Sequence, residues 1–362
     1  MEDNLLKLDM LGHDDPSMIR MLEDLTGVNA RTIPLDDPDT MSIFTSSKVL
    51  GFENDELLGP TGAVAIPEFN TRFTRQMLID TQPKDFNTLV RLSGFSHGTD
   101  VWLGNARELI VGGTASVLQT VGCRDDIMLY LISMGLDPKM SFKIMEAVRK
   151  GKVKKGGFQE GWVEAMEEHG VPQWYIESLA KIGYLFPKAH AVAYVMMAFR
   201  IAWFKVHEPL AFYATFFTIR AKAFDAEFCC AGKEAVERKI HEIENNKDAT
   251  AVEQNLLVTL EVCYEFYLRG FHFDTIDIYR SDASKFIITE GGLLPPLISV
   301  HGLGEAAAQD TVEKRKGKTF ISVEEFSMCC SKLSKTHIEQ LKALGAFAGM
   351  ADTSQVNLFD GL

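Results

Sequence analysis

The spacing of apolar residues along this chain is mostly helical, with one short region of strand-like alternation. Helical patterns dominate from about Ser17 to Thr215, and glycine pairs and a Gly-Pro step between them predict loops. Further along, two charged helical patterns, two strand-like runs and a last helical region follow in this order: Lys233–Asn246, Val252–Arg269, Phe271–Tyr279, Lys285–Thr289 and 297–345. The pattern predicts a mainly α protein, with a helical domain followed by an α+β domain.

The segment 184–209 carries the most informative pattern, because cationic side chains interrupt an otherwise apolar helix. Pro187 suits a first helical turn and a second proline ends the helix, so one helix is predicted between them. His190 and Tyr194 share a face near the amino end of this helix, close to Lys188. A helix amino terminus favours anions, so these three residues suit a polyphosphate whose base packs on the tyrosine. The alternative is a buried core helix whose Lys and Arg side chains reach the surface.

Three more cations are candidate anion ligands. Arg200 and Lys205 lie on the same predicted helix, but Arg200 lies roughly 80° around it from His190, so it faces DNA or an acidic neighbour instead. Arg124 stands at a predicted helix start beside two aspartates, and it suits either a triphosphate or those carboxylates.

The segment Arg91–Trp102 mixes small, polar and cationic residues with two glycines. This composition predicts a loop that approaches a ligand closely, and the alternative is a turn that caps a helix over 105–110. The segment Leu297–Ala307 has the look of a helix-hairpin-helix: Gly302 and Gly304 permit a tight turn before a helix start, whose N–H groups suit a DNA phosphate. An ordinary helical hairpin is the alternative there.

Composition indicates a folded, cytoplasmic protein. With 362 residues, of which 46% are hydrophobic, the chain can bury the cores of two or three domains. It shows no leader pattern and no uncharged apolar run approaching the roughly 20 residues that a membrane helix requires, so no membrane is expected. The six cysteines include no Cys-x-x-Cys, so we expect reduced, packed thiols and neither a zinc site nor a disulfide framework.

The formal net charge of −13 argues against a protein coated in nucleic acid. Two cationic runs stand out against this average, at 143–155 and 314–318. Each suits either a phosphate-binding patch or solvated loop charges, and the sequence leaves both interpretations open.

Four segments resemble C-family bacterial replicative DNA polymerases, in particular the PolC-type alpha subunits of low-GC Gram-positive bacteria. They are Leu5–Pro16, Arg91–Asn105, Gly122–Ile127 and Tyr184–Pro209, in the order and spacing of the C-terminal part of such a polymerase. The resemblance spans nearly the whole chain. It implies four regions: a remnant of the palm at 1–20, a fingers domain at 21–215, a duplex-binding domain at 216–350 with helix-hairpin-helix units at about 295–350, and a tail at 351–362.

The resemblance also implies roles for these residues. The incoming deoxynucleoside triphosphate is expected to contact Arg91, Ser93, His97, Arg124, Lys188, His190, Tyr194, Arg200 and Lys205. Primer-template DNA is expected to contact Gly302, Gly304, Lys314, Arg315, Lys332 and Lys335. The second hairpin, introduced by Lys332-Leu-Ser-Lys-Thr336, is poor in glycine and departs from the pattern, so its DNA contact is less well supported.

Asp9 is the one metal ligand that the resemblance supports. Lys7-Leu-Asp9-Met-Leu-Gly12 matches the family motif that supplies the third catalytic carboxylate for two Mg²⁺ ions. The paired aspartates of an Asp-x-Asp motif are expected upstream of residue 1, since two-metal phosphoryl transfer needs several carboxylates. We therefore expect an N-terminally truncated chain that does not polymerise DNA alone. Without the resemblance, Asp9 would be interpreted as a strand-end or turn carboxylate.

The tail Gln355-Val-Asn-Leu-Phe359 resembles the pentapeptide that binds the bacterial sliding clamp (the beta subunit). Gln355 is expected at the rim of an apolar pocket that Leu358 and Phe359 fill. The chain is thus interpreted as part of a nucleoid-associated DNA-directed DNA polymerase, with other replisome subunits as further partners. One alternative is a non-catalytic DNA-binding and clamp-binding module, and another is an acidic helical scaffold with neither DNA nor nucleotide affinity.

Overall fold

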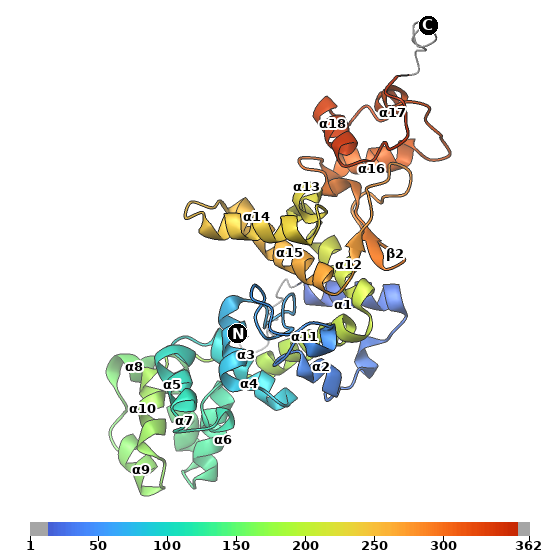
Figure 1. The fold of residues 1–362 in the computed structure, drawn as a ribbon. Coiled ribbons are helices and arrows are strands. Elements are labelled where there is room, and N and C mark those ends of the chain that lie inside the picture. Colours follow the sequence, from blue (N-terminus) through green and yellow to red (C-terminus); the bar gives the residue numbers. More distant parts are fainter. Residues whose placement is uncertain (1–13, 354–362) are drawn as a thin grey trace, which may run out of the picture. The chain divides into compact units, whose positions relative to one another are not determined.

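A computed structural model of the chain describes residues 14–353, and these form two compact units. The central unit is the continuous stretch Asn29–Val206, and the terminal unit combines the residues before it with those from His207 onward. Figure 1 labels the α-helices and β2 and colours the chain along its sequence. The predicted domain boundaries at 20/21 and 215/216 rest on the resemblance and stay predictions.

The central unit is built mainly of helices. Its helices are α2 Pro38–Ser42, α3 Arg72–Thr81, α4 Phe86–His97, α5 Arg107–Val111, α6 Arg124–Ser133, α7 Pro138–Arg149, α8 Lys152–Gly156, α9 Trp162–Glu168, α10 Gln173–Lys181 and α11 Lys188–His207. Local sequence explains several starts: Asp85 and Asp137 accept hydrogen bonds from the first turns of α4 and α7. Helices α6 and α7 pack against each other as a hairpin.

The terminal unit joins helices to a small sheet. Its elements are α1 Asp15–Thr26, α12 Pro209–Ile219, α13 Ala226–Cys229, α14 Lys233–Asn245, α15 Ala251–Leu268, β1 His272–Phe273, β2 Ile287–Thr289, β3 Gly292–Leu294, α16 Glu305–Lys314, α17 Val323–Cys329 and α18 Lys335–Ala343. The sheet has the order β1-β3-β2, with β3 parallel to β1 and antiparallel to β2. These elements confirm the predicted mainly α class with an α+β part.

Two details of the sheet differ from the sequence prediction. The run Phe271–Tyr279 forms only the two residues of β1, and β3 was not predicted. All three residues of β3 are buried, so the strand shows no polar alternation that could reveal it.

The predicted loop over Arg91–Trp102 is wrong for its first half, because α4 continues to His97. Gly94 lies inside this helix and has an ordinary helical backbone conformation, so the space around it, and not its backbone angles, requires a glycine. A Cβ atom at Gly94 would lie 2.3 Å from the carbonyl oxygen of Gly122. The glycine therefore allows α4 to approach the backbone before α6, rather than a ligand.

Aromatic side chains form the core of the terminal unit. Tyr213 and Phe217 of α12 lie against Phe266 of α15, with ring centroids 5.2 Å and 5.9 Å from it. Phe273 of β1 packs on Phe266 at 4.6 Å. Helix α1 packs on α12, so residues from both ends of the described chain build this unit.

Helix α11 is long and apolar enough to cross a membrane by length and composition alone, which the sequence prediction had not recognised. In the structure 44% of its residues in the most apolar stretch are buried inside the protein. Buried Lys205 also ties this helix to backbone carbonyls of the central unit, as described below. Such a helix is equally the core helix of a folded domain.

The cysteines match the prediction of reduced thiols. All six are free, and Cys123, Cys229, Cys263 and Cys330 are buried. Burial raises the pKa of the Cys123 thiol to about 12, so it stays protonated at neutral pH.

Candidate functional site

The starts of α6 and α11 are held together by hydrogen bonds. The backbone N–H of Lys188 donates to the Asp125 carboxylate at 2.7 Å, and the N–H of Arg124 donates to the Phe186 carbonyl at 3.1 Å. Asp125 thus caps the first turn of α11. This arrangement brings Lys188 and Arg124, which are far apart in the sequence, to the same end of the two helices.

A cluster of rings lies at this end of α11. The ring of His190 lies 4.4 Å from Tyr194, 5.0 Å from Phe186 and 5.7 Å from His97, measured between centroids. The predicted shared face of His190 and Tyr194 is therefore confirmed. His97 comes from the end of α4, so the cluster, which we name the ring cluster, joins residues of two helices and the segment between α10 and α11.

Glu68 positions two of the predicted site residues and was missed by sequence reasoning. Its Oε2 lies 2.6 Å from His97 Nε2 and accepts a hydrogen bond from Ser93 Oγ at 3.0 Å. The backbone of Glu68 has φ 70°, which is unusual for a residue with a side chain. No motif marks this glutamate, because its relation to His97 exists only in the folded chain.

The Glu68 carboxylate changes the protonation of His97. The hydrogen bond to Glu68 raises the pKa of His97 above its ordinary value, against a smaller lowering effect of burial. The His97 side chain is 36% exposed while that of Glu68 is 5% exposed, so the imidazole faces solvent with the carboxylate behind it. Ser93 is buried and acts on Glu68 instead of on a ligand.

Arg91 connects α4 to the start of α6. Its Nη1 lies 2.6 Å from the Asp126 carboxylate and donates to the Thr120 carbonyl at 2.6 Å, and the side chain is only 13% exposed. Asp126 in turn accepts hydrogen bonds from the N–H groups of Gly122 and Cys123. Arg91 therefore holds α4 against the start of α6 and is not exposed at the surface of the site.

The structure does not bring Lys205 and Arg200 to the ring cluster. Lys205 is completely buried and donates to the carbonyls of Gly62 and Val64 at 2.8 Å and 2.6 Å. Arg200 lies further along α11, and its Nε is buried without a hydrogen-bond partner among the described residues. Burial explains why helix position alone was not enough to place these cations.

The predicted hairpin forms before α16. Gly302 has φ 74° and Gly304 is the residue before the first turn of α16, so the turn and a helix start adjoin as expected. Leu303 between them is buried, and the two glycines are exposed. The second hairpin is formed by α17 and α18, with Ser334 accepting a hydrogen bond from the first turn of α18.

The cations predicted near the hairpins differ in their surroundings. Lys314 and Lys332 both lie near the Asp310 carboxylate, at 3.1 Å and 3.2 Å. Lys335 is exposed at the start of α18. Arg315 is buried and donates to the carbonyls of Ile278 and Ser281, so it fixes the sheet region to α16 instead of facing DNA.

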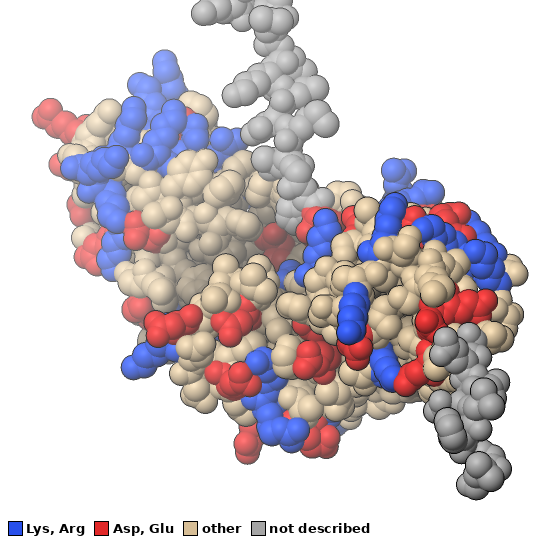
Figure 2. Space-filling view, turned by 90° about the horizontal axis from the view of Figure 1, so that it is seen from above, with Lys and Arg blue, Asp and Glu red and all other residues tan. Residues whose placement is uncertain are grey.

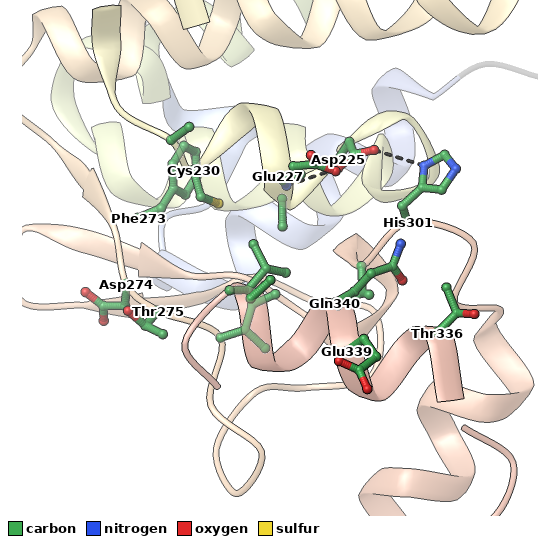
Figure 3. Close-up of a pocket in the computed structure, with 16 residues that line it drawn as sticks. Asp225, Glu227, Cys230, Phe273, Asp274, Thr275, His301, Thr336, Glu339 and Gln340 are labelled. Carbon is green, nitrogen blue, oxygen red and sulfur yellow. Dashed lines mark hydrogen bonds and ion pairs between the residues drawn. The ribbon is translucent and has the colours of Figure 1, made fainter. Parts of the chain in front are cut away.

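A cavity of about 620 Å³ lies in the terminal unit between α13, β1 and α18 (Figure 3). It is lined by four carboxylates and no Lys or Arg, and the carboxylates are those of Asp225, Glu227, Asp274 and Glu339. His301 Nδ1 lies 3.0 Å from Asp225 at its edge. A phosphate would be repelled here, so this cavity is not the predicted nucleotide site.

Several predicted residues lie outside the described residues: Asp9, Gln355, Leu358 and Phe359. Within residues 14–353 no group of three or more His, Cys, Asp or Glu side chains is arranged to hold a metal ion. The described residues therefore do not form a site for two Mg²⁺ ions.

Comparison with known proteins agrees with this arrangement. Residues 15–170 match the family described as the bacterial DNA polymerase III alpha subunit finger domain, and residues 270–356 match the helix-hairpin-helix motif. The chain is 56% identical over 356 residues to DNA polymerase III PolC-type of Caldanaerobacter subterraneus subsp. tengcongensis, covering 98% of the chain and 25% of the relative. It is 52% identical to that of Bacillus cereus over 358 residues and 48% identical to that of Streptococcus mutans over 364 residues, covering 99% of the chain and 25% of the relative in both cases.

The chain spans about a quarter of the length of these relatives. The identity extends over nearly all of the chain, and the finger-domain match includes α4 and α6 of the described site. The chain therefore belongs to the PolC-type DNA polymerase III alpha subunits and comprises a finger domain and a helix-hairpin-helix motif of that family.

Proposed function

We propose that the ring cluster and the start of α11 bind the incoming deoxynucleoside triphosphate of a template-directed DNA polymerase. The observation that carries this proposal is the meeting of His97, His190 and Tyr194 with Lys188 and Arg124 at one end of α6 and α11. Rings offer a surface for a base or sugar, and cations offer charge for phosphates. Both requirements of a nucleotide are present in one place.

The residues divide into ligands and supports. Phosphoryl transfer depends mainly on positioning and on charge placed around the phosphates, so Lys188, Arg124 and protonated His97 supply the electrostatic part. Arg91 and Ser93 are positioning residues through Asp126 and Glu68. Arg200 and Lys205, which lie away from the rings, support α11 instead of the ligand.

The exposed hairpin before α16 is proposed to hold the duplex backbone. Gly302 and Gly304 leave the first N–H groups of α16 open to an approaching phosphate, which gives binding without sequence preference. Lys335 is an exposed cation at the first position of α18 and would add charge for a phosphate there. Lys314 and Lys332 pair with the Asp310 carboxylate. On DNA binding, each lysine would exchange this carboxylate for a phosphate.

The remaining functions concern the whole polymerase and are proposed from the family. Asp9, with carboxylates outside the described residues, would hold Mg²⁺ ions, which supply charge stabilisation to nucleotidyl transfer when bound. The segment 355–359 would bind the sliding clamp, and other replisome subunits would be further partners. A cytoplasmic location at the nucleoid accords with these partners.

Binding of a fluorescent deoxynucleotide to the purified chain tests the nucleotide site. We expect saturable binding that His190→Ala weakens at least tenfold, because the ring between Phe186 and Tyr194 is removed. His241→Ala, at an exposed position of α14, is the matched control and should leave the affinity unchanged. Equal affinities of the wild-type chain and His190→Ala would contradict the site.

The alternative function is a DNA-binding and clamp-binding module without a nucleotide site. It predicts duplex binding and clamp binding but no saturable nucleotide affinity. Clamp capture with and without Phe359→Ala examines the tail separately, and both functions predict that this substitution abolishes capture. Nucleotide binding is therefore the measurement that separates them.

A further inference from the structure

The cationic run 143–155 forms an exposed surface on α7 and α8. Lys143, Lys152, Lys154 and Lys155 are exposed, and so is Lys150 between the helices. Lysine and arginine side chains gather at the left of Figure 2, the side on which Figure 1 places α7 and α8. We name these five residues the lysine surface.

Most of this charge is available for a partner. Within residues 14–353, no ion pair or hydrogen bond engages the ammonium groups of Lys143, Lys152 or Lys155. Lys150 pairs with Glu146, and Lys154 pairs with Asp100 at 2.6 Å. Glu146 pairs with both Lys150 and Arg149, so its single negative charge does not neutralise these two cations.

The lysine surface is fixed to the segment that leads into the ring cluster. A Cβ atom at Gly151, between α7 and α8, would lie 2.4 Å from the Gly183 carbonyl oxygen. The N–H of Leu185 donates to the Arg149 carbonyl, and Tyr184 packs on Phe186 with centroids 5.1 Å apart. The segment 183–186 therefore connects the ring cluster directly to α7 and α8.

Exposed rings accompany the lysines. Tyr184 is 40% exposed and Phe142 of α7 is 50% exposed. Cationic side chains interleaved with accessible rings suit single-stranded nucleic acid, whose bases are free to stack while its phosphates are neutralised. An acidic protein partner would use the charges but would leave the rings without a comparable role.

We propose that the lysine surface binds the backbone of single-stranded DNA, with Tyr184 and Phe142 as stacking positions. This inference rests on the proposed nucleotide site, because the unpaired template must leave that site next to the incoming nucleotide. The strand would cross the 184–186 segment and continue along α7 and α8. The lysine surface belongs to the central unit, whereas the helix-hairpin-helix motif belongs to the terminal unit.

The test measures binding of a fluorescein-labelled thymidine oligonucleotide to the full chain by anisotropy at several salt concentrations. The variant is Lys143→Gln with Lys152→Gln and Lys155→Gln. The control is Arg31→Gln with Lys48→Gln and Lys84→Gln, which removes the same charge from exposed positions of the same unit. Tyr184→Ala is measured alone to examine stacking.

We expect the triple lysine variant to lose tenfold or more in affinity at about 0.1 M salt. Its salt slope should fall by about 2, since each phosphate contact of single strands contributes about 0.7. The control should keep the wild-type slope and affinity to within about twofold to threefold. Tyr184→Ala should weaken binding about fivefold or more with an unchanged slope, because stacking releases no counterions.

Three results would overturn the inference, and the first two are no binding of the oligonucleotide by the wild-type chain and equal losses in the lysine variant and the control. Binding of an acidic peptide in place of DNA would also overturn it. Fluorescent deoxynucleotide affinity, measured on the same samples, keeps this outcome separate from the proposed function. Nucleotide binding without oligonucleotide binding would leave the nucleotide site standing and remove the lysine surface.

Discussion

At the scale of single residues, neighbours decide what a cation can do. Lys188 and Lys205 lie on the same helix, yet Lys188 stands half-buried at its start and Lys205 is completely buried against two carbonyl oxygens. His97 differs from an ordinary surface histidine because Glu68 lies behind it. The surroundings of His97 and of the two lysines can each be tested by substitution.

Glu68→Gln should lower the pKa of His97 toward its ordinary value of 6.5. The hydrogen bond to Glu68 raises that pKa, so the pair stabilises the fold fully below pH 6.5, and this stabilisation is lost as the pH rises through the raised value. Histidine-selective NMR titration measures the shift. Glu53→Gln, at an exposed position of the same unit, should leave His97 unchanged.

Lys205→Met and Lys188→Met should have opposite effects. Lys205→Met leaves two buried carbonyls without this donor, so the free energy of unfolding should fall by about 2–4 kcal/mol while nucleotide affinity of the folded protein is kept. Lys188→Met should weaken nucleotide binding with little effect on stability. Urea denaturation and nucleotide titration of both variants check this, and a stability loss in Lys188→Met alone would refute it.

At the scale of elements, close backbone approach sets the site. Helix α4 carries Arg91, Ser93 and His97, and it reaches the start of α6 only because Gly94 faces Gly122. Helix α11 is held at its start by Asp125 of α6. The two helices that supply the ring cluster are thus fixed relative to one α6 terminus.

Gly94→Ala should separate α4 from α6. Its Cβ would meet backbone that cannot move independently, so we expect a loss of about 2 kcal/mol or more in unfolding free energy and weaker nucleotide binding. Gly156→Ala is the matched control, since Gly156 ends α8 with nothing within 4 Å of its Cβ. There alanine should be neutral or stabilising by about 0.5–1 kcal/mol. Thermal unfolding of both variants measures the contrast.

At the scale of the whole molecule, the chain folds as two units, one built from a single stretch of sequence and the other from two stretches. The central unit is one stretch, while the terminal unit packs α1 onto α12 across more than a hundred intervening residues. The described part of both units lacks a group of three metal-binding side chains.

The purified chain should bind nucleotide and primer-template DNA but show no primer extension with Mg²⁺. Two-metal nucleotidyl transfer needs several carboxylates that hold two cations about 4 Å apart. Residues 14–353 contain no group of three or more His, Cys, Asp or Glu side chains arranged to hold a metal ion. A primer-extension assay over a range of Mg²⁺ concentrations measures this. Template-dependent extension by the chain alone would contradict the prediction.

Local sequence patterns were enough to predict the mainly α class, the long helix near Lys188 and the turn at Gly302, because apolar periodicity, prolines and glycines act locally. They also predicted helices at 233–246 and 252–269, which the structure has at 233–245 and 251–268. The sequence motifs also indicated the family. Tertiary structure alone decided that Arg91–His97 is helical, that Arg315 and Lys205 are buried, and that Glu68 supports His97. These outcomes depend on contacts between distant segments, where a carbonyl or carboxylate that no local pattern reveals fixes the role of each side chain.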